Sequence, residues 1–171
     1  MNWVHIHLLL NHLPVIGIVL ALPILAWGIR KRSQEVMRVA VALLAGLAAV
    51  TFAVYFTGEP AEESVEGLAG VADSLIEAHE EAALLATVAF GVLGAVAVGG
   101  LIRFRGRAIP ARFATLVLLL GLIPAGLVAW AANLGGQIRH TEIGAEPTAE
   151  GPPVTVETRI GGFVIQPEAG R

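Results

Sequence analysis

Five histidines are the residues of this chain that are best suited to chemistry. Three precede or begin the first apolar run, one precedes the third run, and one follows the fourth: His5, His7, His12, His79 and His140. The neutral imidazole nitrogen is a good ligand for copper, zinc, nickel and iron. Two histidines from different helices can also hold a b-type haem in the core of a helix bundle. The histidines therefore indicate a haem or metal site wherever the fold brings two of them together.

His12 and His79 are the pair whose depths match. His12 immediately precedes the uncharged run 13–29, and His79 lies three residues before the uncharged run 82–102. At a rise of about 1.5 Å per residue, the two histidines lie within about one helical turn of the same height. We therefore predict that His12 and His79 bind a haem or a metal, and that His140 can reach the same layer as a third metal ligand.

Each histidine also has an ordinary structural explanation. Imidazoles at a membrane interface bond to water, lipid headgroups or helix ends, and this explanation suits His5 and His7 best. His140 follows Gly135 and Gly136, where a helix stop is expected, so a capping or loop role competes with ligation there.

Carboxylates near the histidines offer additional ligands, or acceptors for the second ring nitrogen. Those closest in sequence to the expected site are Glu59, Glu80 and Glu81. A di-iron carboxylate site is not expected, because Glu77 precedes His79 by two residues and not by the three of a Glu-x-x-His motif. The acidic segment is otherwise typical of a solvated surface.

Four apolar helices must position these side chains. The chain has 171 residues, of which 56% are hydrophobic and 15% charged, and its mean hydropathy is +0.75. About 20 apolar residues span the hydrocarbon core of a bilayer as a helix, and four runs qualify. We predict an all-α integral membrane four-helix bundle over residues 1–137. Its helices are expected at about 5–29, 36–57, 79–103 and 111–134.

The distribution of charge predicts the orientation. Eight of the eleven basic residues lie in the two short connections after the first and third helices: Arg30, Lys31, Arg32, Arg38, Arg103, Arg105, Arg107 and Arg112. Short loops rich in lysine and arginine stay in the cytoplasm, so both termini and all five histidines are expected outside. The basic cluster follows the first apolar run, whereas a secretory signal carries its charge before that run, so we expect this helix to be retained.

Two segments outside the spans have weaker patterns. Residues 58–78 are predicted to form an amphipathic periplasmic helix, with Pro60 in its first turn and an apolar stripe that includes Val65, Leu68 and Leu75. Residues 138–171 are expected to form an irregular periplasmic tail, in which 154–158 and 161–165 suit a small β-hairpin.

The absence of cysteine excludes several classes of site. Without thiols the chain has no disulfide, no thiolate metal site, no cysteine-held iron–sulfur cluster and no covalently attached c-type haem. Hydrolytic enzymes are not favoured either, because no Ser/His/Asp arrangement, phosphate-binding loop or nucleic-acid patch is present. The sequence leaves open whether the protein is an enzyme.

Three short motifs resemble a family of small, four-helix bacterial membrane proteins of unassigned function. They are Asn11-His12-Leu13-Pro14, Gly58-Glu59-Pro60-Ala61-Glu62-Glu63 and His79-Glu80-Glu81-Ala82-Ala83. The resemblance covers roughly the first hundred residues, and this chain has His12-Leu13-Pro14 where the family typically has His-Phe-Pro. It implies a bacterial inner-membrane location and a redox context, without supplying a reaction.

Two functions are consistent with these patterns. The first is an electron-transfer subunit that carries a b-type haem or a metal at the periplasmic face. The second is a non-catalytic accessory subunit of a larger bacterial membrane complex. Expected partners are the lipid bilayer and either other subunits of such a complex or a periplasmic redox protein. A transporter is less favoured, because the centres of the last three helices lack ionisable residues.

Overall fold

The computed structural model describes residues 2–64, 73–139, 159–160 and 163–164. Five helices account for nearly all of these residues, and their bounds are α1 Trp3–Leu10, α2 His12–Lys31, α3 Gln34–Glu62, α4 Asp73–Arg103 and α5 Ala111–Arg139. A single pair of two-residue strands, β1 Arg159–Ile160 and β2 Phe163–Val164, is antiparallel with Ile160 opposite Phe163. The expected hairpin region therefore contains a short strand pair, whereas 154–158 lie outside the described residues.

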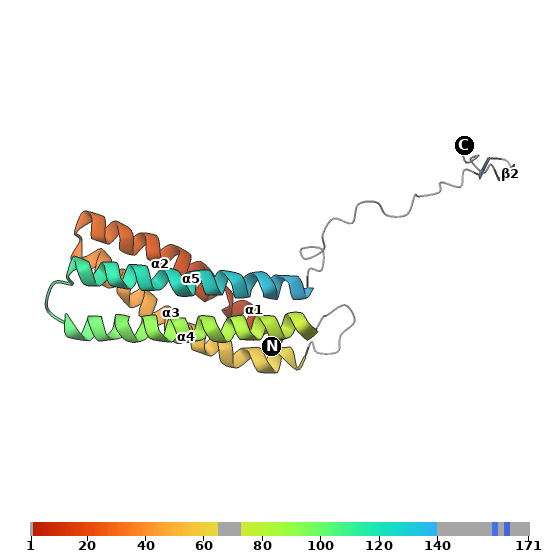
Figure 1. The fold of residues 1–171 in the computed structure, drawn as a ribbon, viewed down its shortest axis with the longest axis horizontal. Helices are drawn as coiled ribbons and strands as arrows, with labels where there is room; N and C mark the ends of the chain where they lie inside the picture. Colours follow the sequence, from red (N-terminus) through yellow and green to blue (C-terminus); the bar gives the residue numbers. More distant parts are fainter. Residues whose placement is uncertain (1, 65–72, 140–158, 161–162, 165–171) are drawn as a thin grey trace.

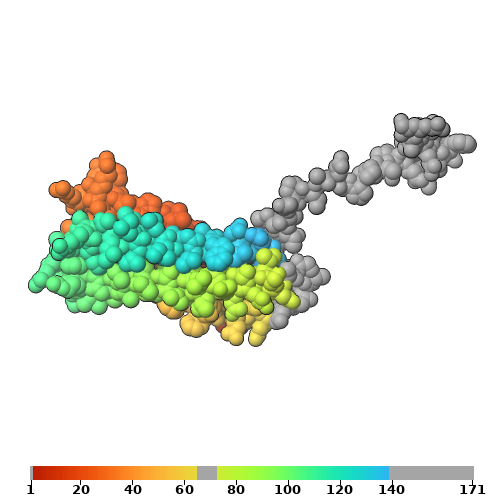
Figure 2. All heavy atoms as spheres, in the orientation of Figure 1, coloured from red at the N-terminus to blue at the C-terminus, as the bar shows by residue number. Residues whose placement is uncertain are grey.

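The long helices form an antiparallel bundle (Figure 1). Each of α2, α3 and α4 packs against the next helix in the chain, and α2 also packs against α5, which closes the ring. Helix α1 lies mainly against α3. Figure 2 shows α4 and α5 in contact along their length.

Four helical segments are long and apolar enough to cross a membrane. They are Trp3–Lys31, Gln34–Glu62, Asp73–Arg103 and Ala111–Ile138, each with a mean hydropathy of 2.2 or 2.3 over its most apolar window. The outward-facing side chains are largely apolar too, including Val19, Phe56 and Ile123, as a lipid-facing surface requires. These findings support the predicted multi-pass membrane bundle.

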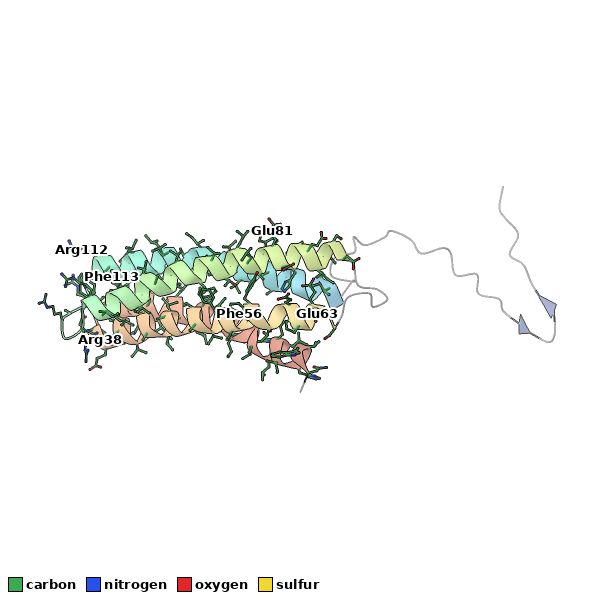
Figure 3. The ribbon with its side chains drawn as sticks, turned by 90° about the horizontal axis from the view of Figure 1, so that it is seen from below. Arg38, Phe56, Glu63, Glu81, Arg112 and Phe113 are labelled. Carbon is green, nitrogen blue, oxygen red and sulfur yellow. The ribbon has the colours of Figure 1, made fainter. Side chains whose placement is uncertain are left out.

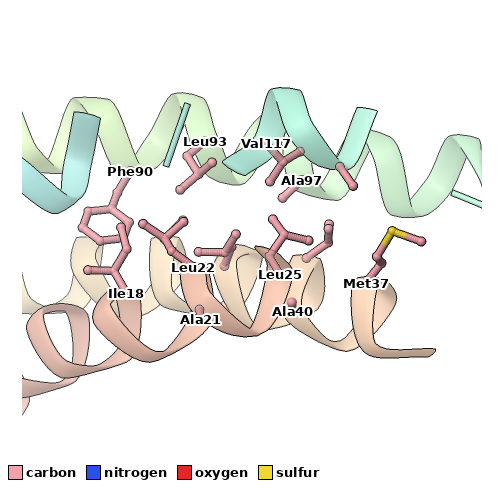
Figure 4. Packing of buried hydrophobic residues seen from close by; sticks show 14 of the residues in the cluster. Ile18, Ala21, Leu22, Leu25, Met37, Ala40, Phe90, Leu93, Ala97 and Val117 are labelled. Carbon is pink, nitrogen blue, oxygen red and sulfur yellow. The ribbon is translucent and has the colours of Figure 1, made fainter. Parts of the chain in front are cut away.

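The core is a column of apolar side chains along the bundle axis (Figure 4). Ile18, Leu25, Phe90 and Leu93 are completely buried in it. Lipid tails are as apolar as leucine, so close packing rather than water exclusion holds such helices together. Gly94 shows how close the approach is, because a Cβ placed there would lie 2.5 Å from the Cβ of Ala48 on α3.

The first membrane span is divided at Asn11, which keeps right-handed helical dihedral angles between α1 and α2. Pro14 explains the division, since it has no N–H to donate to the carbonyl of Leu10 one turn earlier. Helix α1 is thus a separate two-turn element that carries His5 and His7.

Three helix ends differ from the sequence expectation. Helix α3 continues through Pro60 to Glu62, α4 already begins at Asp73, and α5 continues to Arg139. The ends of the segment 58–78 therefore belong to α3 and α4 and not to a separate amphipathic helix, while 65–72 lie outside the described residues. The helices predicted from the sequence are too short because their ends were placed close to the ends of the uncharged runs. In the structure, helical backbone hydrogen bonding continues into the flanking residues.

Most of the basic residues lie at one end of the bundle, which we call the arginine end: Arg30, Lys31, Arg32, Arg38, Arg103, Arg105, Arg107 and Arg112. Figure 3 shows Arg38 and Arg112 at this end and Glu63 toward the opposite one. Arg38 donates from Nη2 to the carbonyls of Phe104, at 3.3 Å, and Arg107, at 2.8 Å. It therefore neutralises the carbonyl-rich C-terminus of α4.

Gln34 joins the two connections at the arginine end. Its Nε2 donates to the carbonyl oxygen of Ile109 at 3.2 Å, and its Oε1 accepts from the backbone N–H of Ile109 at 2.7 Å. One side-chain amide thus satisfies both backbone groups of a buried residue in the α4–α5 connection. We call this pair of bonds the Gln34 clamp.

Candidate functional site

Candidate ligands lie at the end of the bundle opposite the arginine end. We call it the histidine end, and it contains α1, the last turns of α3, the first turns of α4 and the last turns of α5. Its described ionisable residues include His5, His7, His12, His79, Glu59, Glu63, Asp73, Glu77, Glu80 and Glu81.

His79, on α4, is half-buried against α5. Its Nδ1 lies 2.8 Å from the carbonyl oxygen of Ala131. Because a carbonyl oxygen only accepts hydrogen bonds, Nδ1 must carry the proton and donate it. The neutral ring then has its lone pair on Nε2, which is the arrangement of a metal-ligating histidine whose other nitrogen is held by a backbone carbonyl.

Gly135 makes room for this ring. A Cβ at position 135 would lie 3.0 Å from Cε1 and 3.2 Å from Nδ1 of His79. At the adjacent Gly136, a Cβ would meet no atom within 4 Å. Gly135 therefore has a specific packing role and does not end the helix, since α5 continues to Arg139.

His7, on α1, is held in the same way by α3. Its Nδ1 lies 3.2 Å from both the carbonyl oxygen of Val54 and Oγ1 of Thr57. The Thr57 hydroxyl donates its own proton to Val54 at 2.7 Å, so it accepts from His7. Nδ1 of His7 is therefore the donor, and Nε2 of the neutral ring has the free lone pair.

His7 and His79 both lie at the histidine end, on α1 and α4 respectively. They come from helices that do not pack together, because α1 contacts α2 and α3 while α4 contacts α3 and α5. The histidine end thus holds two half-buried imidazoles, each fixed through Nδ1 and each able to offer Nε2.

His12 and His5 have different surroundings. His12 is exposed, and its Nδ1 donates to the carbonyl of Leu8 at 2.7 Å within its own span. His5 is also exposed and donates from Nδ1 to the Asn2 side chain at 2.8 Å. No interaction between the described residues links His12 to His79, so their joint ligation stays a prediction.

The remaining predicted ligands contribute less. His140 lies outside the described residues, so its role as a third ligand stays a prediction as well. Glu59, Glu80 and Glu81 are exposed and make no hydrogen bond to an imidazole in the described part of the chain. Nδ1 of His7 and Nδ1 of His79 therefore donate to backbone carbonyls, and in His7 also to the Thr57 hydroxyl, and not to carboxylates. Within the described ranges no three side chains of the usual ligand types gather to hold a metal ion.

His7 is the residue whose position the sequence analysis missed. Histidines were paired in the prediction by their distance from the uncharged runs. Helices α3 and α4 extend well beyond those runs, so side chains still pack together at the level of His7. Thr57 was the available signal, because a polar residue at the end of the second apolar run suggests a side-chain partner.

No protein-family model, no curated protein and no solved structure matches this chain. What the protein does is therefore inferred from its own residues.

Proposed function

We propose that this protein is an electron-transfer subunit of a bacterial inner membrane, which binds a b-type haem or a transition metal at its histidine end. His79 is the first ligand. The second ligand is His7, in place of the His12 that depth alone suggests. The proposal rests on one observation: His7 and His79 are both half-buried, and both hold Nδ1 in a hydrogen bond that leaves Nε2 free.

Two protein ligands suit a b-type haem, since the porphyrin supplies the other donors to the iron. They also suit a metal ion whose remaining positions are taken by water or by a small ligand. A closed zinc site needs four protein ligands and is not proposed. His140 is the predicted third ligand for the metal alternative.

The core supports electron transfer over transport. In the described residues the only buried polar side chains are Thr51 and Thr87, and each donates its hydroxyl to a carbonyl one turn back in its own helix. Ion and proton pathways through membranes usually use ionisable residues inside the spans. A fixed redox group near one face needs no such pathway.

The orientation proposed with this function places the histidine end and both termini in the periplasm, because the arginine end suits the cytoplasm. Glu59, Glu63, Glu80 and Glu81 are exposed at the histidine end. Such a surface favours a basic periplasmic donor or acceptor, and salt would weaken the association by screening charges beyond about 10 Å.

The alternative is a non-catalytic accessory subunit of a larger membrane complex. The same apolar core favours it, since a subunit that only packs against partners needs no polar groups within the membrane. A bound redox group distinguishes the two functions directly.

The test is the absorption spectrum and metal content of the purified full-length protein. Wild type should show a Soret band or about one equivalent of transition metal. His79→Ala and His7→Ala should each lose it, and the exposed His5→Ala should keep it. If His12→Ala lost the bound haem or metal and His7→Ala kept it, the ligands would be His12 and His79, as their matching depths suggest. Wild-type protein with neither haem nor metal would leave the accessory-subunit function.

A further inference from the structure

A cavity of about 460 Å³ lies at the arginine end, where α4 ends and α5 begins. Its lining residues are Arg103, Phe104, Pro110, Arg112, Phe113 and Leu116. The cavity has no part in the proposed redox site, which lies at the opposite end of the bundle. Figure 3 shows Arg112 and Phe113 at this end.

The cavity is flanked by two positive charges without counterions. Arg103 and Arg112 have no carboxylate within ion-pair distance among the described residues, and Arg103 lies only over the ring of Phe104, 5.7 Å from its centroid. The other charged side chains at this end are basic except for Glu35. Guanidinium groups without carboxylate partners are well suited to bind phosphate, because their fork of N–H donors matches its oxygens.

The part of the cavity lined by Phe104, Phe113 and Leu116 is apolar. The rings of Phe104 and Phe113 pack with their centroids 5.2 Å apart, and Leu116, one turn further into the span, is exposed. Phe113 is held in place against the backbone of α4 at Gly100, where there is no room for a Cβ. A ligand that fits this cavity therefore carries an anionic group at the membrane surface and an apolar chain below it.

Backbone donors add to the positive charge. The carbonyl of Pro110 accepts from the N–H groups of Phe113 and Ala114, so α5 begins beside the cavity. The N–H groups of Ala111 and Arg112 come before the first bond of the helix and have no backbone acceptor among the described residues. Such free amides at a helix N-terminus favour phosphate oxygens.

We propose that this cavity binds the headgroup phosphate of an anionic phospholipid, with Arg103 and Arg112 as its ligands and an acyl chain lying along Leu116. Two charged headgroup contacts and an apolar chain explain why guanidinium groups and aromatic rings share one cavity at the membrane boundary. The partner is a lipid of the same leaflet, and not a free anion from solution.

The experiment uses delipidated full-length protein in detergent and native mass spectrometry to count bound lipids. Wild type is titrated with phosphatidylglycerol, with phosphatidylcholine as the neutral lipid and inorganic phosphate as the free anion. The double variant Arg103→Gln/Arg112→Gln is compared with Arg105→Gln/Arg107→Gln. The control removes the same charge from exposed residues of the same connection that do not line the cavity.

Wild type should bind one phosphatidylglycerol at least about tenfold more tightly than phosphatidylcholine, as expected for charged hydrogen bonds. The Arg103/Arg112 variant should lose that preference and the control should keep it. Equal weakening in both variants would show a diffuse basic surface and overturn the site. Two results with the wild type alone would also overturn the proposed lipid site. One is equal affinity for phosphatidylglycerol and phosphatidylcholine, and the other is an affinity for inorganic phosphate as high as that for phosphatidylglycerol.

Discussion

His79 shows how a single backbone carbonyl determines which nitrogen of an imidazole is available. The Ala131 carbonyl fixes the proton on Nδ1 and leaves the lone pair on Nε2, and Val54 with Thr57 does the same for His7. The residue types of this site were predictable, because histidine is the usual nitrogen ligand for transition metals and haem iron, and the chain has no cysteine. The burial of His7 was not, because it depends on how α1 packs against α3.

Gly135 provides a test at this scale. In Gly135→Ala the new Cβ would press on the His79 ring and displace Nδ1 from the Ala131 carbonyl. Loss of such a supporting bond typically lowers metal affinity by about 10- to 100-fold. We expect Gly135→Ala to bind haem or metal at least about tenfold more weakly, measured by titration of the apo-protein.

The matched control for this titration is Gly136→Ala, where the added methyl meets no atom within 4 Å. It should bind as wild type does. Equal affinities in the two variants would show that the position of the His79 ring does not matter for binding.

At the scale of the helices, glycine sets how closely neighbours approach. Gly94 faces Ala48 across the α3–α4 contact, whereas Gly99 on the same helix has open space around it. The existence of the four helices was predictable, because a lipid bilayer admits only long apolar segments whose backbone bonds are satisfied internally. Their exact ends and contacts were not, because these depend on which small residues meet.

The contrast between these glycines predicts opposite effects on stability. Gly94→Ala should lower the stability of the bundle by about 1–3 kcal/mol, because two Cβ atoms on rigid helices would overlap. Gly99→Ala should leave stability unchanged or raise it by up to about 1 kcal/mol through better helix propensity. Thermal unfolding of both variants in the same detergent measures the difference. A Gly94→Ala variant as stable as Gly99→Ala would contradict the close α3–α4 contact.

At the scale of the molecule, charge separates the two ends of the bundle. Basic residues gather at the arginine end and exposed carboxylates at the histidine end. This separation was evident from the sequence, since it follows from the order of loops and spans. The pairing of His7 with α3 was not, because it arises from the three-dimensional register of the bundle.

The lack of native cysteine allows a direct test of orientation. Single cysteines introduced as Ser64→Cys and Arg105→Cys occupy exposed positions at opposite ends of the bundle. In intact bacterial cells with a permeabilised outer membrane, a membrane-impermeant thiol reagent should label position 64 and leave position 105 unlabelled. Cell lysis should make both reactive. Labelling of 105 but not 64 in intact cells would reverse the proposed topology.

The Gln34 clamp has a mechanical consequence for the whole molecule. It joins the α2–α3 hairpin to the α4–α5 hairpin at the arginine end, through bonds to both backbone groups of Ile109. Because this end is fixed by polar bonds and the rest of the contact is apolar packing, we expect relative movement of the hairpins to be greatest at the end farthest from the clamp. That opposite end is the histidine end, where His7 of α1 contacts α3 and His79 of α4 contacts α5. The polar joint between the hairpins thus lies at one end of the bundle, and the two half-buried imidazoles lie at the other.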